Sequence, residues 1–251
     1  MSAHRTPSPR PGRLDVRAGW RPGTDFGDDS RAPVTHMTYA SADGHSWDAL
    51  LAHPPAPSAR SEVLVIAVHG SMGNYTSGVV RRVTLELARH GYPTLSVNTR
   101  MANFGVIYGG GRLDQAPEDL DGALALAREL GYGRVALMGY GLGATMVAHH
   151  QALRRPADVE AVLTLAHPSS LPDALRERWR THGAAPGYDA MLERAARRAG
   201  ADDHGDDIVV VARGSGTRDV PADTEVWTER TWWASRAPQA THARFCAGPC
   251  E

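Results

Sequence analysis

The stretch RVALMGYGLGATMVAHHQALRR, residues 134–155, decides the fold of this chain. Its first five residues form an apolar run typical of a strand covered on both faces, and its second half has the spacing of a helix. Gly139, Gly141 and Gly143 lie at the sharp corner between the two. Glycine lets a chain turn tightly and lets a helix pack close to a strand. The stretch therefore predicts a strand–turn–helix unit whose turn has a residue without a side chain at its centre.

Strand and helix signals alternate along the chain on both sides of this unit. Continuous apolar runs predict the strands, helical spacing predicts the helices, and Gly91 ends the first helix. The expected strands are 62–68, 93–98, 134–138 and 159–168, and the expected helices are 75–90, 116–130 and the second half of the opening stretch. Alternating segments in residues 34–54 predict a β-hairpin. This order predicts an α/β fold with a mostly parallel sheet and helices on both faces.

Composition limits the class of protein. A chain of 251 residues, of which 42% are hydrophobic, can bury a substantial core in one α/β domain. The net charge of −1 gives no reason to expect a nucleic-acid partner. Cys246 and Cys250 are the only cysteines and lie at the end of the chain, without the spacing of a disulfide framework or a metal site. We therefore expect a cytoplasmic protein without metal or cofactor.

Two parts of the chain differ in composition from the α/β core. Residues 1–33 are rich in Pro, Arg, Gly and Asp and predict a disordered leader before a domain of residues 34–251. Residues 171–199 have helical spacing, and after DDHGDD come a short strand and a Trp-bearing segment. We expect about residues 169–236 to form a cap over the carboxyl edge of the sheet. The best apolar run, residues 63–68, falls well short of the roughly 20 residues that span a bilayer, so no membrane partner is expected.

The glycine corner reads GxGxG where the nucleophile elbow of serine hydrolases reads GxSxG. Together with HGSMGN after the first core strand, SVNTR after the second and LAHPSS after the fourth, it resembles the α/β-hydrolase superfamily from about residue 34 to residue 236. The resemblance implies an α/β-hydrolase fold with an inserted helical cap, and a small acyl or ester ligand. It implies oxyanion donors from the backbone of Leu142 and of Ser71 or Met72. The other motif residues that it assigns are His69, Gly70, Gly139, Tyr140 and Gly143.

The nucleophile position of the resemblance falls on Gly141. In this superfamily the acid and the histidine follow the nucleophile in chain order. After Arg236 the sequence APQATHARFCAGPCE contains no apolar strand, so we expect the acid, the histidine and the last strands to be missing. Loss of the serine alone lowers the turnover of a serine hydrolase about 10⁶-fold. The sequence therefore predicts a relative of serine ester and acyl hydrolases that is inactive or severely impaired.

Three other functions stay open. A noncovalent enzyme would use the same pocket for elimination, epimerisation or cyclisation, and a binding protein would hold a small acyl ligand without turnover. GYGLGA also fits the GxGxxA pattern of dinucleotide-binding turns. Such a unit needs an acid at the end of the following strand, but that strand ends in Ala166, His167 and Pro168. Its one acid, Glu160, lies at the other end, so dinucleotide binding ranks below the hydrolase interpretation.

Several polar side chains have a structural interpretation beside a functional one. His167, at the end of the fourth core strand, is the remaining candidate for a catalytic base. His69 is expected to anchor its loop by hydrogen bonds, and Arg100 is expected to pair within its own loop. Thr145 and Ser71 lie away from the apex of the elbow, so neither is expected to replace the nucleophile.

The remaining sequence features do not indicate a specific reaction. His149 and His150 lie on the helix after the corner, one expected to be buried and the other solvated, without a partner visible in the sequence. The tryptophans expected to anchor the cap are Trp227, Trp232 and Trp233. A sheet without its last strands ends in an exposed edge, which favours self-association.

Overall fold

The computed structural model describes residues 32–55, 61–71, 73–102, 111–182, 185–199, 208–213 and 223–228. Six of its strands form one sheet in the order β1-β2-β4-β3-β5-β6. Strands β3, β4, β5 and β6 run parallel, whereas β1 and β2 form an antiparallel hairpin that joins β4. The strands of the sheet are β1 (Val34–Ala40), β2 (Ser46–Ala52), β3 (Val63–Val68), β4 (Thr94–Val97), β5 (Arg134–Tyr140) and β6 (Val159–Leu165).

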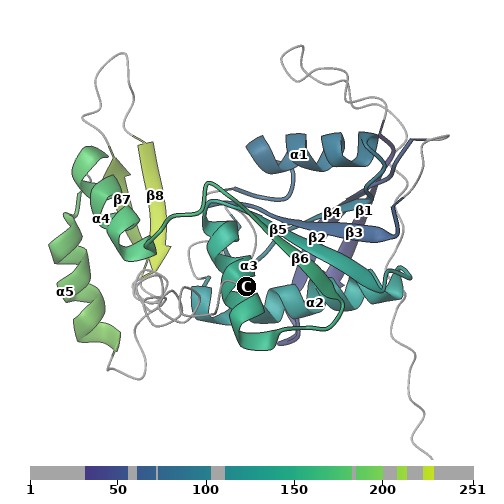
Figure 1. Cartoon of the computed structure of the whole chain (residues 1–251). Helices are drawn as coiled ribbons and strands as arrows, with labels where there is room; N and C mark the ends of the chain where they lie inside the picture. Colours follow the sequence, from purple (N-terminus) through teal and green to yellow (C-terminus); the bar gives the residue numbers. More distant parts are fainter. Residues whose placement is uncertain are drawn as a thin grey trace, which may run out of the picture.

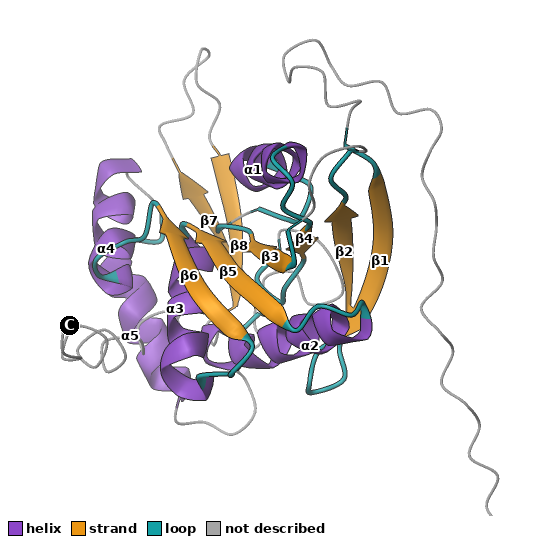
Figure 2. Ribbon diagram, turned by 45° about the vertical axis from the view of Figure 1, so that its right-hand side comes forward, coloured by secondary structure: helices purple, strands orange, loops and turns teal. Residues whose placement is uncertain are grey.

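Helices cover both faces of the sheet (Figures 1 and 2). Helix α1 lies on one face, and α2 and α3 lie on the other. The helices of this core are α1 (Gly78–Arg89), the short 3₁₀ helix η3 (Leu113–Gln115), α2 (Ala116–Glu129) and α3 (Leu142–Arg154). The predicted hairpin, the predicted core strands and the mostly parallel sheet between two helical layers are confirmed.

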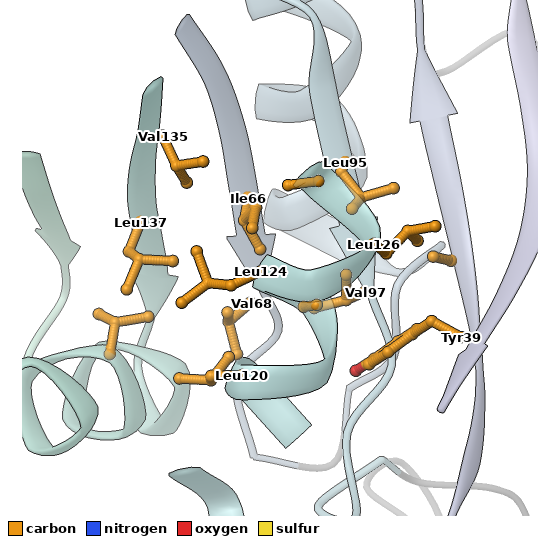
Figure 3. Packing of buried hydrophobic residues seen from close by; sticks show 14 of the residues in the cluster. Tyr39, Ile66, Val68, Leu95, Val97, Leu120, Leu124, Leu126, Val135 and Leu137 are labelled. Carbon is orange, nitrogen blue, oxygen red and sulfur yellow. The ribbon is translucent and has the colours of Figure 1, made fainter. Parts of the chain in front are cut away.

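The core lies between the sheet and α2 (Figure 3). Leu120 and Leu124 of α2 are fully buried against the apolar side chains of β3, β4 and β5, which include Ile66, Leu95 and Leu137. Burying a leucine side chain contributes about 1.5–3 kcal/mol, so this layer supplies much of the stability of the sheet. Strand β3 is apolar along its whole length, as expected for a parallel strand that helices cover on both faces.

The start of α1 differs from the prediction. The spacing predicts a helix from residue 75, but α1 begins at Gly78 after the N-cap residue Ser77. The Asn74 side chain accepts hydrogen bonds from the Thr76 amide and hydroxyl, and the Ser77 hydroxyl accepts one from the Asn74 amide. These local bonds hold residues 74–77 in a turn, because Asn and Ser side chains compete with helical backbone bonds. Gly91, with φ +93°, follows α1 as predicted.

The predicted leader, residues 1–33, lies outside the described residues except for its last two. Ala32 is buried and belongs to a small cluster with Ala52, Leu85 and Ala88. The carbonyl of Pro33 accepts a hydrogen bond from the His53 amide. The packed chain therefore extends at least two residues into the segment predicted as leader.

The part of the chain after β6 forms two helices and a two-stranded sheet. These elements are α4 (Leu171–His182), α5 (Tyr188–Ala199), β7 (Ile208–Arg213) and β8 (Asp223–Thr228). The prediction of one helical region over residues 171–199 was wrong in detail, because Pro186 and Gly187 interrupt it. The predicted short strand corresponds to β7, but β8, which contains Trp227, was not predicted. Trp232 and Trp233 lie outside the described residues, and the assignment of residues 169–236 as a cap stays a prediction.

Strand β6 has a neighbour on one side only within the sheet of the described residues. Its side chains are half-buried or exposed, and Leu163 is 43% exposed. By contrast, β3 and β5 are buried along nearly their whole length. The described part of the chain therefore has an open sheet edge at β6.

Candidate functional site

The glycine corner joins β5 to α3 with close backbone packing. A Cβ atom on Gly139 would lie 2.2 Å from the carbonyl oxygen of Gly143. A Cβ atom on Gly143 would lie 2.5 Å from the carbonyl oxygens of Val68 and His69. Real Cβ atoms do not approach other atoms this closely, so both positions need glycine. The corner thus holds α3 directly against the carboxyl end of β3.

Gly141 forms the apex of the corner and differs from its two neighbours. Its backbone has φ +55° and ψ −116°, a conformation that residues with side chains rarely adopt. Its amide donates to the Leu165 carbonyl at 2.8 Å, and its carbonyl accepts from the Ala144 amide at 3.0 Å. Among the described residues other than its two chain neighbours, a Cβ atom here would have only the Gly70 Cα within 4 Å, at 3.9 Å. The apex therefore combines a strained backbone with room for a further atom.

The loop after β3 lies beside this apex. A Cβ atom on Gly70 would lie 3.0 Å from the ring of Tyr140 and 3.1 Å from its carbonyl oxygen. The next residue, Ser71, is exposed, and Met72 lies outside the described residues. Leu142, the first residue of α3, is buried. The structure thus brings the loop of His69 and Gly70 together with the GYGLG corner, as the resemblance implied, while the oxyanion roles of Ser71 and Leu142 stay a prediction.

His69 is fully buried and both of its ring nitrogens are engaged. Nδ1 lies 2.9 Å from the Gly70 carbonyl, which can only accept, so Nδ1 carries the proton in the neutral ring. Nε2 then accepts from the Thr99 hydroxyl at 3.0 Å. Burial lowers the pKa of His69 to about 4, so the ring is neutral at pH 7. The predicted role as a loop anchor agrees with this arrangement, since no ring nitrogen is left to act as a base.

Arg100 belongs to a buried network below the same edge of the sheet. Its guanidinium and amide donate to both carboxylate oxygens of Asp119, and Nη2 also donates to Asp43. The indole of Trp47 donates to Asp119 at 3.0 Å. Burial lowers the pKa of Arg100, but the hydrogen bonds and charges of Asp119 and Asp43 outweigh burial and raise it. The role of Arg100 is structural, but the prediction that it pairs within its own loop was wrong, because its partners lie on α2 and in the hairpin and tie the loop after β4 to both.

The other candidate histidines lie in different surroundings. His167 is half-buried and follows Ala166, whose φ of +51° marks a strained turn directly after β6. His150 is fully buried, and its Nε2 lies 2.8 Å from a carboxylate oxygen of Asp121 on α2. No local sequence pattern predicts this pair, because Asp121 and His150 meet only when α2 packs against α3. His149 is half-buried, and burial lowers its pKa.

Thr145 lies one helical turn after the apex. It is 8% exposed, and its hydroxyl oxygen has no hydrogen-bond partner among the described residues. The prediction placed Thr145 away from the apex position itself, and the structure places it within α3. The described residues contain no group of three or more His, Cys, Asp or Glu side chains that could hold a metal ion. Across the same residues, no helix is long and apolar enough to cross a membrane.

Comparisons with known proteins support the fold rather than a specific activity. No protein-family model matches the chain, and no curated protein matches it in sequence. A hypothetical protein from Pseudomonas aeruginosa, PA2218, has a similar structure, with a TM-score of 0.61, 14% identity, and coverage of 88% of this chain and 77% of that one. The α/β hydrolase GrgF from Penicillium sp. sh18 gives a TM-score of 0.57 at 15% identity over 82% of this chain and 73% of its own.

A third similar structure is an esterase. Pf2001 from Pyrococcus furiosus gives a TM-score of 0.50 at 16% identity over 67% of this chain. The chain spans 62% of the length of that esterase. At these identities the similarity concerns the fold. With its mostly parallel sheet, its two helical layers and the glycine corner at the edge of β5, the chain has the α/β-hydrolase fold.

Proposed function

We propose that this protein binds a small acyl ligand, an ester or a carboxylate, at the elbow and forms no acyl-enzyme. The observation that carries the proposal is Gly141, which has the backbone of a strained apex but no side-chain atom to attack a carbonyl carbon. Within the described part of the chain, only Gly70 comes within 4 Å of the position of a Cβ atom at Gly141, chain neighbours aside, and a ligand atom is proposed to lie there.

The size of the rate loss without a serine nucleophile argues against covalent catalysis. Removing the serine from a serine hydrolase costs about 10⁶-fold in turnover, and the donors that remain supply a rate enhancement of only about 10³–10⁴ over water. His69, which directly precedes Gly70 beside the apex, is held neutral between Gly70 and Thr99. Among the residues that the structure describes, no side chain at the apex therefore supplies the nucleophile that an esterase reaction needs.

The backbone at the start of α3 supports the proposal that the protein binds a ligand. The first amides of a helix have no acceptor within the helix, and the helix dipole favours negative charge at this end. Gly141 has no side chain that could cap these amides. An oxygen atom of an acyl group, which carries partial or full negative charge, therefore matches the N-terminus of α3.

The test is thermal unfolding of the full chain with hexanoate and with methyl hexanoate, while product release from the ester is followed in parallel. A ligand at 100 times its Kd stabilises a protein by about 2.7 kcal/mol. The variant Gly141→Leu fills the space at the apex and is expected to abolish stabilisation by both ligands. Gly131→Leu is the matched control, because Gly131 has φ +87° and open space at the end of α2.

Stabilisation of the native protein without product, lost in Gly141→Leu and kept in Gly131→Leu, is the expected result. A covalent acyl adduct, or steady ester turnover that Gly141→Leu removes, would overturn the proposal. The second of these outcomes would favour the noncovalent enzyme instead. Absence of stabilisation by either ligand would also overturn it.

A further inference from the structure

Strand β6 has a free edge whose backbone groups can pair with another strand. Among the described residues β6 pairs only with β5, and it lies at one end of the sheet (Figure 2). The Leu165 carbonyl accepts from the Gly141 amide just past β5, so the backbone groups of Leu165 face β5. Successive residues of a strand alternate in direction, and the register shift between the two strands lies at their start. Val162 and Thr164 therefore direct their N–H and C=O groups away from β5.

The centre of this edge lacks the features that usually keep sheets from joining. Such features are lysines, prolines, bulges and inward-pointing charges. The sequence of β6, VEAVLTL, contains one charged residue, Glu160. Its carboxylate accepts from Nε and Nη2 of Arg134 on β5 at 2.6 and 3.0 Å, so the sheet itself compensates this charge. Ala161 and Leu163 are exposed beside it. An apolar strand of this kind is a template for a further strand.

The pattern of apolar and polar residues in β6 is symmetric about Val162. A second copy of β6, placed antiparallel with Val162 opposite Val162, brings the polar residues Glu160 and Thr164 opposite each other. Every apolar residue then faces an apolar one, since Ala161 lies opposite Leu163 and the two ends of the strand lie opposite each other. The two Glu160 carboxylates are not opposite, so no like charges meet across the strands. The strand is therefore complementary to a second copy of itself.

The neighbouring registers are less favourable. An axis at Leu163 places Val162 opposite Thr164, and an axis at Ala161 places Glu160 opposite Val162. An axis between two residues places outward-facing backbone groups opposite inward-facing ones, so ladder hydrogen bonds cannot form. Only the axis at Val162 combines matched side chains with matched backbone groups.

We propose that two copies of this chain pair through β6 in antiparallel register, with a two-fold axis at Val162, and form one continuous sheet. Opposite residues share a face of the sheet, so the exposed Leu163 of each copy packs beside Ala161 of the other. The same edge serves both copies, so the assembly closes at two. This pairing does not depend on the ligand proposed for the elbow.

Sedimentation velocity of the full chain over a range of concentrations tests the assembly. Val162→Pro removes an N–H that points away from β5, which an edge strand tolerates, and two such donors are lost per dimer. The variant is expected to weaken dimerisation about 10-fold or more and to keep the native circular dichroism. Val162→Thr is the matched control, because it keeps the backbone donor and a side chain of similar shape, and it is expected to dimerise like the native chain.

Cysteine cross-linking tests the register, in chains whose Cys246 and Cys250 are replaced by serine. Opposite residues whose backbone groups face away from the partner have Cα atoms about 4.5 Å apart, within the range of a disulfide. Residues one diagonal step away are about 7–8 Å apart, too far for one. Ala161→Cys and Leu163→Cys are therefore expected to form a disulfide dimer under mild oxidation when the two chains are mixed, and not when either is alone.

A native chain that sediments as a monomer at all concentrations, or as assemblies larger than two, would overturn the proposal. Equal dimerisation of a folded Val162→Pro would also overturn it. If that variant does not fold, the cross-linking result decides. A disulfide dimer of Leu163→Cys alone or of Ala161→Cys alone would contradict the axis at Val162, and no disulfide in the mixture would contradict the pairing of the β6 edges.

Discussion

Single alanine substitutions at the three corner glycines are predicted to have unequal effects on stability. At Gly141 the new methyl group meets only the Gly70 Cα among the described residues beyond its chain neighbours, so no steric overlap with them is expected. The cost is the strained backbone, about 1–3 kcal/mol, less about 0.4–1 kcal/mol from the smaller entropy of the unfolded chain. We expect Gly141→Ala to lower the free energy of unfolding by about 0.5–2 kcal/mol.

Gly143→Ala is predicted to lower the free energy of unfolding much more than Gly141→Ala does. Its methyl carbon would lie 2.5 Å from two carbonyl oxygens, whereas ordinary contact begins at 3.4 Å. The atoms in the way are main-chain atoms of residues 68 and 69, so either the end of β3 or the start of α3 must move by nearly an ångström. Overpacking a rigid core costs about 1–3 kcal/mol and more where the neighbours cannot adjust, so we expect a loss above about 3 kcal/mol. Gly139→Ala, with a carbonyl oxygen at 2.2 Å, is expected to resemble Gly143→Ala.

Urea and thermal unfolding of the full chain, followed by tryptophan fluorescence and circular dichroism, measure these differences. For a chain of this size about 1 kcal/mol shifts Tm by roughly 2–4 °C, so the two classes of variant separate clearly. Gly44→Ala is the control for backbone strain alone, since Gly44 has φ +90° and open space in the hairpin turn. A loss of unfolding free energy in Gly141→Ala as large as that in Gly143→Ala would refute the claim that the apex has room for a methyl group. A tolerated Gly143→Ala would refute the close packing of the elbow.

Three further perturbations test the surroundings of the elbow. The pKa of His69 is about 4 in the folded chain against 6.5 for an ordinary histidine, so the unfolded chain takes up the proton first as pH falls. Lowering the pH from 7.5 to 5.5 is therefore expected to reduce the free energy of unfolding of the native protein by about 1.4 kcal/mol more than that of His69→Gln, as measured by urea titrations. Identical pH profiles of the two proteins would contradict this. Asp119→Asn leaves the buried Arg100 without its main charge partner, so urea unfolding is expected to show a loss of about 3–5 kcal/mol, and a loss below about 1 kcal/mol would contradict the network. Leu163→Lys places a charge on the exposed edge strand, which is expected to reduce self-association in light scattering, and a native chain that stays monomeric at high concentration would contradict that expectation.

The centre of the sheet was predictable because β3 and most of β5 are continuous apolar runs. Residues 63–68 and 134–140 have to be covered on both faces, and the helices between them supply the cover. The start of α1 was not predictable from spacing, because side chains at Asn74 and Ser77 form a turn where the apolar pattern alone continues the helix. The strand β8 was not predictable because its sequence DTEVWT has only two apolar residues, Val226 and Trp227, and so lacks a continuous apolar run.

The elbow itself was predictable, whereas the contacts around it were not. Three glycines between an apolar strand and a helix predict close packing, and the overlaps at Gly139 and Gly143 agree with that. The partners of His69 and His150 depend on which helix and which loop lie opposite in the folded chain. Thr99 and Asp121 are 30 and 29 residues away from them in sequence, and no local pattern marks either pair.

Intact mass spectrometry after incubation of the native chain with p-nitrophenyl hexanoate, and separately with a fluorophosphonate probe, tests the central claim most directly. Without a nucleophile at Gly141, the mass is predicted to stay that of the unmodified chain with both reagents. An adduct that maps to the elbow or its oxyanion loop, and that disappears in Ser71→Ala or Thr145→Val, would contradict the claim and show that another hydroxyl performs acyl-enzyme chemistry.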